Sequence, residues 1–189
     1  MKKLSPGKSS GCKILTNRVL KETAVFTAAF LSYLYNLSLN TCVFPDEWKV
    51  AIVTPVFKQR WKADDPTNYR PISLLPAIGK VLDHIQCDVL LKYLMKSDLI
   101  SSHQFGFLPK RSTTRQLIYI TDRWIRSLDS GSSVVAAFMD FEKAFDRVWH
   151  SGLLYKLGRC GVLQSALNWL QNYLQLADCG SRGVDNCIT

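Results

Sequence analysis

The residues best suited to chemistry lie in one stretch, VVAAFMDFEKAFDRVWH, at positions 134–150. Its apolar first part, residues 134–139, begins with β-branched side chains and ends abruptly at the carboxylate of Asp140. This pattern is typical of a strand buried on both faces, with Asp140 where the strand leaves the core. A carboxylate there can hold a divalent cation against a phosphate, because Mg²⁺ prefers hard oxygen ligands. The alternative is a structural Asp that caps a strand or a helix.

Asp146 is the nearest candidate for a second metal-binding carboxylate. Catalysis by two metal ions about 3.5–4 Å apart needs at least two such groups. Six residues along a helix, however, correspond to a rotation of about 240° away from Asp140. We therefore interpret Asp146 as a solvent-exposed or structural residue. A phosphotransferase built on Asp140 alone would need Thr, Lys and Asp partners that we do not find at suitable spacings.

The elements that position Asp140 follow from the apolar periodicity. Helical spacing predicts a first helix from Asn17, as its cap, to about Asn40. It also predicts helices over 77–97 and 111–129, and one or two more over 152–157 and 163–176. A short helix after Asp140 would place Phe141 and Phe145 on one face. Two strands, 49–57 with a bend at Pro55 and 69–75, are separated by the charged loop KQRWKADDPTN, which predicts a hairpin with a basic tip.

Composition sets broad limits on the protein. A chain of 189 residues with 47% apolar and 21% charged residues suits one domain, or one and a half, with a sizeable core. The net charge of +9 is uneven, since residues 1–62 hold ten Lys/Arg against three Asp/Glu. A basic front half suggests contact with phosphates or an acidic membrane surface, and ordinary solubility charge is the alternative.

Cysteine spacing and hydropathy indicate the compartment. The six cysteines form no C-x-x-C pair, and three histidines are too few for the usual zinc patterns. No signal peptide precedes them, so we expect reduced thiols and an intracellular protein, in the nucleus or the cytoplasm. The apolar segment 24–39 is shorter than the ~20 residues of a membrane span, and predicts a buried helix and no membrane partner.

Four stretches in order resemble a known family. They are FPDEWKVAIVTPVFK (44–58), NYRPISLLPAIGKVLD (68–83), QFGFLPKRST (104–113) and DFEKAFDRVWH (140–150). Together they resemble reverse transcriptases of non-LTR (LINE-like) retrotransposons. The resemblance implies an α+β right-hand polymerase fold with fingers and an incomplete palm. The expected parts are an N-terminal arm and helix at 1–40, fingers at 41–130, the first half of the palm at 131–176 and a divergent tail at 177–189.

The same resemblance implies an RNA-directed DNA polymerase that uses an RNA template, a DNA primer, dNTPs and Mg²⁺, or Mn²⁺ in its place. Asp140 is implied as the first catalytic and metal-binding carboxylate, with the backbone carbonyl of Phe141 at the same metal. The ring of Phe145 would act as a steric gate against a 2′-hydroxyl, and a core Phe paired with Phe141 is the alternative. The backbone amides of Lys143 and Ala144 would face the triphosphate.

Further phosphate contacts are implied outside that stretch. Arg70 matches the fingers arginine that grips the triphosphate, because its fork of donors meets phosphate oxygens bidentately, and a surface Arg is the alternative. Lys58 and Lys62 are equal candidates for a second contact at the hairpin tip. Lys110 and Arg111, at a predicted helix start, are weaker candidates for the template backbone, and a solvated basic face is the alternative.

Two motifs of the family are missing from the sequence. It contains neither the Tyr-x-Asp-Asp turn that carries the partner carboxylate nor the Pro-Gln-Gly motif before it. We therefore expect a truncated copy that is inactive alone, with exposed apolar surface beside 134–139. The alternative, of a different class, is a non-catalytic nucleic-acid-binding remnant whose affinity falls steeply with salt. The oligomeric state, and whether another chain supplies the missing motifs, stay open.

Overall fold

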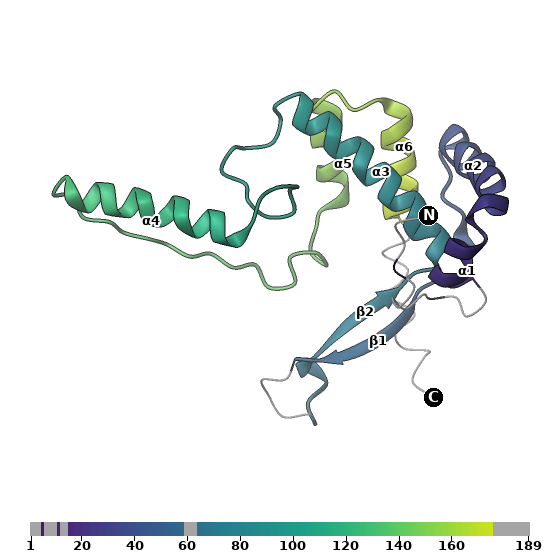
Figure 1. The fold of residues 1–189 in the computed structure, drawn as a ribbon, viewed down its shortest axis with the longest axis horizontal. Coiled ribbons are helices and arrows are strands. Elements are labelled where there is room, and N and C mark those ends of the chain that lie inside the picture. Colours follow the sequence, from purple (N-terminus) through teal and green to yellow (C-terminus); the bar gives the residue numbers. More distant parts are fainter. Residues whose placement is uncertain (1–4, 6–10, 12–14, 59–63, 176–189) are drawn as a thin grey trace. The chain divides into compact units, whose positions relative to one another are not determined.

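The computed structural model describes residues 5, 11, 15–58 and 64–175. Its helices and strands, in chain order, are α1 (Asn17–Glu22), α2 (Ala24–Thr41), β1 (Ile52–Phe57), β2 (Tyr69–Leu74), α3 (Ala77–Lys96), α4 (Thr113–Asp129), α5 (His150–Arg159) and α6 (Gln164–Leu174) (Figure 1). The chain divides into two compact units, the first made of residues 1–90 and 149–189 and the second of residues 91–148. The mixture of helix and sheet confirms the coarse part of the predicted fold class.

The first predicted helix is interrupted at Thr23, which separates α1 from α2. Thr23 bonds back to the carbonyl of Val19 through its amide, at 2.9 Å, and its hydroxyl, at 2.8 Å, so the side chain competes with the helix for backbone partners. The predicted cap at Asn17 is wrong by one residue. The hydroxyl of Thr16 accepts from the amide of Val19 at 3.3 Å, and Asn17 is the first helical residue.

Strands β1 and β2 form the predicted hairpin, an antiparallel pair in which Phe57 lies opposite Tyr69. Their rings contact each other, with centroids 5.3 Å apart. Pro55 lies opposite Pro71. The amide of Lys58 donates to the carbonyl of Asn68, and the hydrogen-bonded pairs of an antiparallel ladder recur at every second residue. Pro55 and Pro71 therefore form a non-hydrogen-bonded pair, where the missing amide hydrogens remove no ladder bond.

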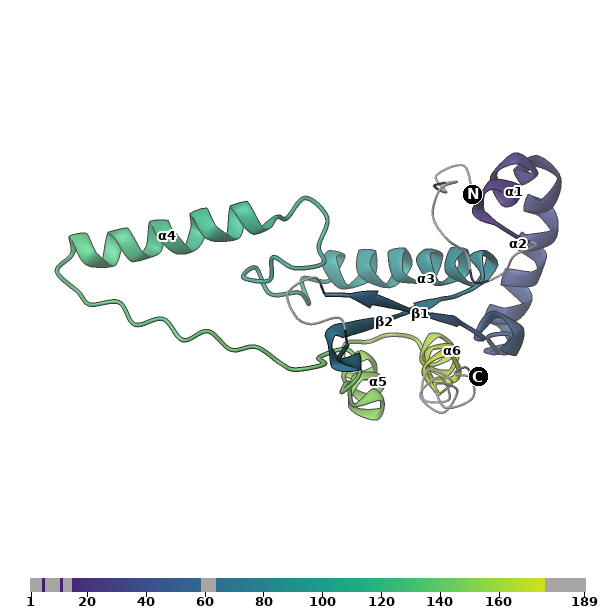
Figure 2. The ribbon, with the colours of Figure 1, turned by 90° about the horizontal axis from the view of Figure 1, so that it is seen from below.

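The core of the first unit joins helices that are far apart in the sequence. Its buried members come from α1, α2, α3, α6 and the segment after α2, and are Leu20, Leu31, Tyr35, Phe44, Ala77, Leu82 and Trp169. Trp169 donates from its indole to the hydroxyl of Ser38 at 3.0 Å, and the amide of Phe44 donates to Asn172 at 2.9 Å. These bonds attach α6 to α2 and to the segment after α2, and α5 packs beside α6 (Figure 2).

The predicted helix over 24–39 is present as part of α2, but the prediction that it is buried is wrong for one of its faces. Leu31 and Tyr35 are buried, whereas Phe26 and Phe30 are 85% and 64% exposed. The helix is apolar on all sides, but α1 and α6 cover only part of its surface. None of the helices among the described residues is long and apolar enough to cross a membrane.

The strand predicted over 134–139 is wrong. The segment is irregular chain, drawn as a plain tube between α4 and α5 in Figure 1, and Val135, Phe138 and Met139 are each more than 80% exposed. A strand requires a hydrogen-bonded neighbour. Among the described residues the only two strands, β1 and β2, pair with each other. The apolar run is consequently an exposed segment without a partner strand.

Candidate active site

Asp140 lies in the second unit, between the exposed segment and a series of turns over residues 142–147. The short helix predicted here is wrong, because Lys143 adopts a left-handed conformation with φ of 52° that interrupts a helix. The carbonyl of Lys143 accepts from the amides of Asp146 and Arg147 at 3.0 and 3.1 Å. The helical rotation used to separate Asp140 from Asp146 therefore does not apply.

The side chain of Asp140 is exposed and offers hard oxygen donors. Those donors suit Mg²⁺, which commonly takes one or two carboxylates and completes its octahedron with waters and substrate phosphates. No three His, Cys, Asp or Glu side chains gather at one place in the part of the chain that the structure describes. The acids described here thus form no closed, all-protein metal cage, and the fit to Mg²⁺ rests on the donor type.

Phe145 is 77% exposed and Phe141 is 79% exposed, so the alternative of a core pair is wrong. The ring of Phe145 instead meets the ring of Phe107 edge-on, with centroids 5.9 Å apart. Phe107 belongs to the stretch QFGFLPKRST. Two of the four stretches that resemble the family thus meet at Phe145, a contact that sequence reasoning missed because it joins residues 38 positions apart.

The predicted triphosphate contacts of the hairpin, Arg70, Lys58 and Lys62, belong to the first unit. Arg70 is exposed on β2, opposite Val56. Lys58 follows β1, and its amide donates to the carbonyl of Asn68 at 2.9 Å, which closes the base of the loop. Lys62 lies outside the described residues. The structure therefore gives the two described side chains an accessible position on the hairpin.

Lys110 and Arg111 precede α4, whose first residue is Thr113. Ser112 caps this helix by accepting from the amide of Arg115 at 3.2 Å. The carbonyl of left-handed Lys110 accepts from Arg115 at 2.8 Å. Arg111 donates to the carbonyl of Ser102 at 2.6 Å, and its guanidinium lies over the ring of Phe105 at 5.1 Å. Arg111 is thus held against an aromatic ring, an arrangement that the sequence did not predict.

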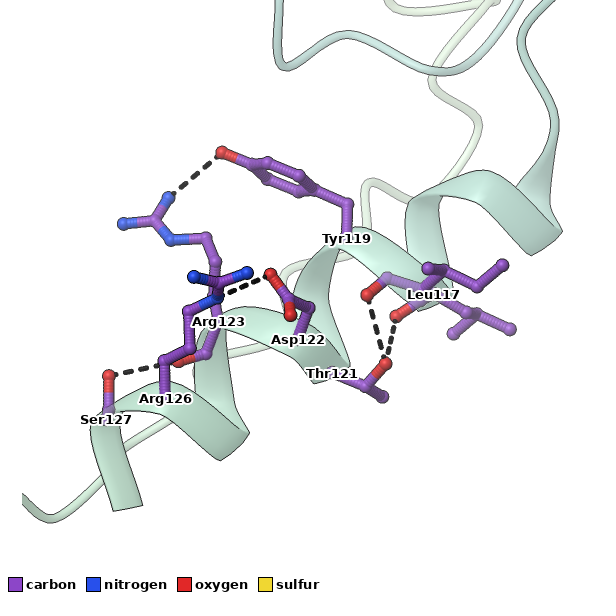
Figure 3. Close-up of polar contacts among 8 residues, drawn as sticks. Leu117, Tyr119, Thr121, Asp122, Arg123, Arg126 and Ser127 are labelled. Atoms are coloured by element: carbon purple, nitrogen blue, oxygen red, sulfur yellow. Dashed lines mark hydrogen bonds and ion pairs between the residues drawn. The ribbon is translucent and has the colours of Figure 1, made fainter. Parts of the chain in front are cut away.

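Helix α4 carries a second arginine–aromatic pair, in which the Arg123 guanidinium lies at the hydroxyl end of Tyr119 (Figure 3). Arg123 donates to the hydroxyl of Tyr119 at 3.3 Å, and its guanidinium lies 5.8 Å from the centre of the ring. One turn away, Arg126 pairs with Asp122 at 2.9 Å, and this hydrogen bond raises the pKa of Arg126. The signal that could have identified these pairs is the i, i+4 spacing of Tyr119 with Arg123 and of Asp122 with Arg126.

Comparison with known proteins places these features in a family. The sequence model for "Reverse transcriptase (RNA-dependent DNA polymerase)" matches residues 58–187. The chain is 34% identical over 157 residues to the RNA-directed DNA polymerase from mobile element jockey of Drosophila melanogaster, which covers 83% of the chain and 17% of that relative. It is 33% identical over 173 residues to the probable RNA-directed DNA polymerase from transposon BS of the same species, covering 88% of the chain and 19% of that relative. The chain spans less than a fifth of the length of these relatives.

Proposed function

This chain belongs to the reverse transcriptase (RNA-dependent DNA polymerase) family, in the group of non-LTR (LINE-like) retrotransposons, and from that premise we propose that it contributes to Mg²⁺-dependent addition of dNTPs to a DNA primer on an RNA template. The observation that carries the proposal is the turn of residues 140–145. It presents an exposed carboxylate and, five residues later, an exposed aromatic ring, in a stretch within the matched region. In this proposal Asp140 and the carbonyl of Phe141 bind the metal ion.

A bound divalent ion would neutralise charge on the triphosphate and on the attacking oxygen. The chain's own residues position the nucleotide around it. Left-handed Lys143 bends the backbone, and consecutive amides in such a bend form a concave anion site, which supports the amides of Lys143 and Ala144 as triphosphate contacts. The exposed ring of Phe145 is rigid and lies under the sugar in this proposal, where it excludes a 2′-hydroxyl.

The hairpin β1–β2 supplies the cations of the proposal. Arg70 binds the triphosphate bidentately, and Lys58 or Lys62 provides a second contact at the loop. In this assignment residues 41–130 form the fingers and residues 131–176 the first part of the palm. Lys110 and Arg111 contact the template backbone.

The 189 residues contain no Tyr-x-Asp-Asp sequence. Since catalysis by two metal ions needs at least a second carboxylate, the chain alone does not extend a primer in this proposal. The competing function, nucleic-acid binding without catalysis, is favoured by the exposed arginine–aromatic pairs before and within α4. The two functions predict different results once a second carboxylate is supplied. Primer extension then depends on Asp140 if the chain is catalytic, and does not if it only binds nucleic acid.

The experiment is primer extension on an RNA template with dNTPs and Mg²⁺. It compares the chain alone with a fusion protein, in which the chain is followed by the segment of the jockey polymerase that comes after the matched region and that would supply the second carboxylate. We expect extension by the fusion only, and a loss of about a hundredfold or more in Asp140→Asn. Asp129→Asn, which changes an exposed acid at the end of α4, is the matched control and should retain the activity. Equal activity of Asp140→Asn and the control would reject the catalytic assignment and leave nucleic-acid binding.

A further inference from the structure

Helix α2 carries a row of large apolar side chains that the rest of the described chain leaves uncovered. We call this row the α2 seam, and its members are Phe26, Phe30, Tyr33 and Leu37, each between 46% and 85% exposed. They follow one another at intervals of four, three and four residues. At about 100° and 1.5 Å per residue they lie within an arc of about 60° and extend over about 16 Å of the helix. This spacing is the repeat with which one helix packs along another.

The opposite face of α2 holds the helix in place. The hydroxyl of Tyr35 donates to the carbonyl of Ile78 at 2.9 Å, and the indole of Trp169 donates to the hydroxyl of Ser38 at 3.0 Å. Leu31 is buried in the core of the first unit. The α2 seam therefore lies on a helix that is already folded and anchored, so covering it requires little further ordering of the backbone.

The chemistry of α2 limits what can cover the seam. Residues 24–45 contain no Asp, Glu, Lys, Arg or His, although the chain carries a net charge of +9. A nucleic acid, an acidic peptide or an anionic membrane surface would find no cation in this stretch, and burying its charges against Phe and Tyr rings is costly. A second copy of α2 brings an equally uncharged surface, so no like charges meet at the contact.

The exposed area of the α2 seam is close to what a pair of copies needs. A Phe or Tyr side chain buries about 150–250 Å², so the exposed fractions of the three rings correspond to about 400 Å² per copy. Two copies thus cover about 800 Å² of ring surface, and Leu37 with the flanking residues brings the total near the ~1,200 Å² of a small stable interface.

The order of the residues fits an antiparallel pair. Phe26 and Leu37 lie equally far from the midpoint between residues 31 and 32, as do Phe30 and Tyr33. A twofold axis at that midpoint places Phe30 opposite the partner's Tyr33, and Phe26 opposite the partner's Leu37. The antiparallel arrangement also sets the two helix dipoles in opposite directions. The seam is therefore complementary to itself.

We propose that the protein forms a homodimer through the α2 seam, with the two α2 helices packed antiparallel about a twofold axis. The proposal goes beyond the function proposed above and does not rest on it, since α2 contains none of the residues assigned to the metal ion, the nucleotide or the template.

The test uses the pairing that the antiparallel arrangement predicts. Phe30→Glu and Tyr33→Lys are made singly in the nuclease-treated 189-residue chain, and sedimentation velocity measures the mass at about 1–100 µM protein and several salt concentrations. The matched control is Tyr155→Lys, at a ring on α5 of the same unit that is 68% exposed. Phe138→Lys, within the exposed residues 134–139, is a second control. Far-UV circular dichroism confirms that each variant is folded.

We expect the unaltered chain and both controls to sediment at twice the 21.4 kDa of one chain. Each seam variant should dissociate with a constant at least about tenfold higher, because its homodimer buries two unpaired charges. An equal mixture of the two seam variants should recover the dimer, since the introduced carboxylate and ammonium groups then lie opposite each other. Salt should not weaken the dimer, because the seam holds no charge and screening reduces the repulsion between two copies of net charge +9.

Several results would overturn the proposal. They are a monomeric unaltered chain over the whole concentration range, dimers of the seam variants as stable as that of the unaltered chain, and a mixture of the two variants that stays monomeric. Loss of the dimer in Phe138→Lys would assign the contact to residues 134–139 instead. A dimer that dissociates as salt rises would indicate a bridging nucleic acid. Binding of a monomeric chain to vesicles of phosphatidylcholine and phosphatidylserine, lost in Phe30→Glu, would assign the seam to a membrane surface.

Discussion

At the scale of single residues, the proposed active site consists of side chains that the fold leaves accessible. Asp140 and Phe145 are exposed on either side of Lys143, whose left-handed backbone is unfavourable for a lysine. Such a conformation in a side chain other than glycine supports a functional hypothesis when it lies beside candidate site residues. The bend matters to the proposal because it orients the amides at 143 and 144 and separates the carboxylate from the ring.

Replacing Phe145 should alter the choice of sugar. In the active fusion protein, Phe145→Val leaves room for a 2′-hydroxyl, so we expect kcat/KM for ribonucleotides relative to dNTPs to rise by about tenfold or more. Phe138→Val, a change at another highly exposed ring, is the control and should leave that ratio unchanged. Single-nucleotide incorporation with each substrate gives the ratio. The same ratio in both variants would contradict the steric role.

A second residue-scale feature is the contact between Asp83 on α3 and Tyr173 on α6. Burial raises the pKa of Asp83, and the hydrogen bond from Tyr173 and the charge of His84 partly oppose this shift. Burial and the neighbouring carboxylate raise the pKa of Tyr173 to about 12. A carboxyl with a raised pKa in the folded protein favours folding most when protonated. Its contribution is complete below the unfolded value near 3.8 and is lost as the pH rises through the folded value.

Asp83→Asn should therefore stabilise the first unit at neutral pH. Asparagine keeps the shape and can still accept from Tyr173, but it carries no buried charge. We expect the variant's advantage in free energy of unfolding to increase as the pH rises from 4 to 7, measured by urea titration of tryptophan fluorescence. Asp88→Asn, at an exposed acid on the same helix, is the control. A larger advantage at pH 4 than at pH 7 would show that the sign is wrong.

At the scale of elements, the hairpin and α4 depend on local interactions more than on packing. No residue of β1, β2 or α4 is buried. An amphipathic helix with an uncovered apolar face gains little from tertiary contacts, so its capping residue contributes a larger share of its stability. This arrangement leaves the side chains of Arg111 and Arg123 accessible.

Ser112→Ala should weaken α4 directly. Losing the cap leaves the amide of Arg115 without its acceptor, and we expect the free energy of local opening across α4 to fall by about 1 kcal/mol. Hydrogen exchange of peptides from residues 113–129, detected by mass spectrometry, measures this change. Ser127→Ala lies inside the same helix and should have a small effect of opposite sign, because alanine favours helix interiors. Equal exchange in the two variants would contradict the capping role.

At the scale of the whole molecule, the two units differ in how much they bury. The first unit has a core in which Leu82 is 0%, Phe44 1% and Trp169 2% exposed. The second unit is described throughout its residues 91–148, and none of them is buried. Regions with few buried apolar contacts open at lower free energy than the global unfolding of the protein. The second unit, which carries Asp140 and Phe145, is thus the less stable part.

Hydrogen exchange should resolve this difference. We expect slow exchange in α2, α6 and the first part of α3, and fast exchange in α4. Leu82→Ala should cost about 2–5 kcal/mol in the first unit and remove its protection, while exchange in α4 stays unchanged. Leu117→Ala, at an exposed position of α4, is the control for the size of the substitution. A simultaneous loss of protection in both units after Leu82→Ala would contradict their independence.

The sequence by itself determined the local elements and the family. The helices over 77–96, 113–129, 150–159 and 164–174 and the hairpin follow from apolar periodicity, β-branched residues and turn composition, which act over a few positions. Family membership followed from four ordered stretches, and the sequence comparison confirmed it. The absence of Tyr-x-Asp-Asp is likewise a property of the sequence alone.

Only the tertiary structure decided which apolar residues are covered and which side chains meet. Residues 134–139 have the composition of a buried strand, but strand formation depends on a neighbour, and among the described residues none pairs with them. The turn at Lys143, the contact of Phe145 with Phe107, and the contacts of Phe105 with Tyr119 and Arg111 also depend on backbone geometry and on residues that are not sequence neighbours. Periodicity reports which face of an element is apolar, whereas burial and pairing depend on what another part of the molecule places against it.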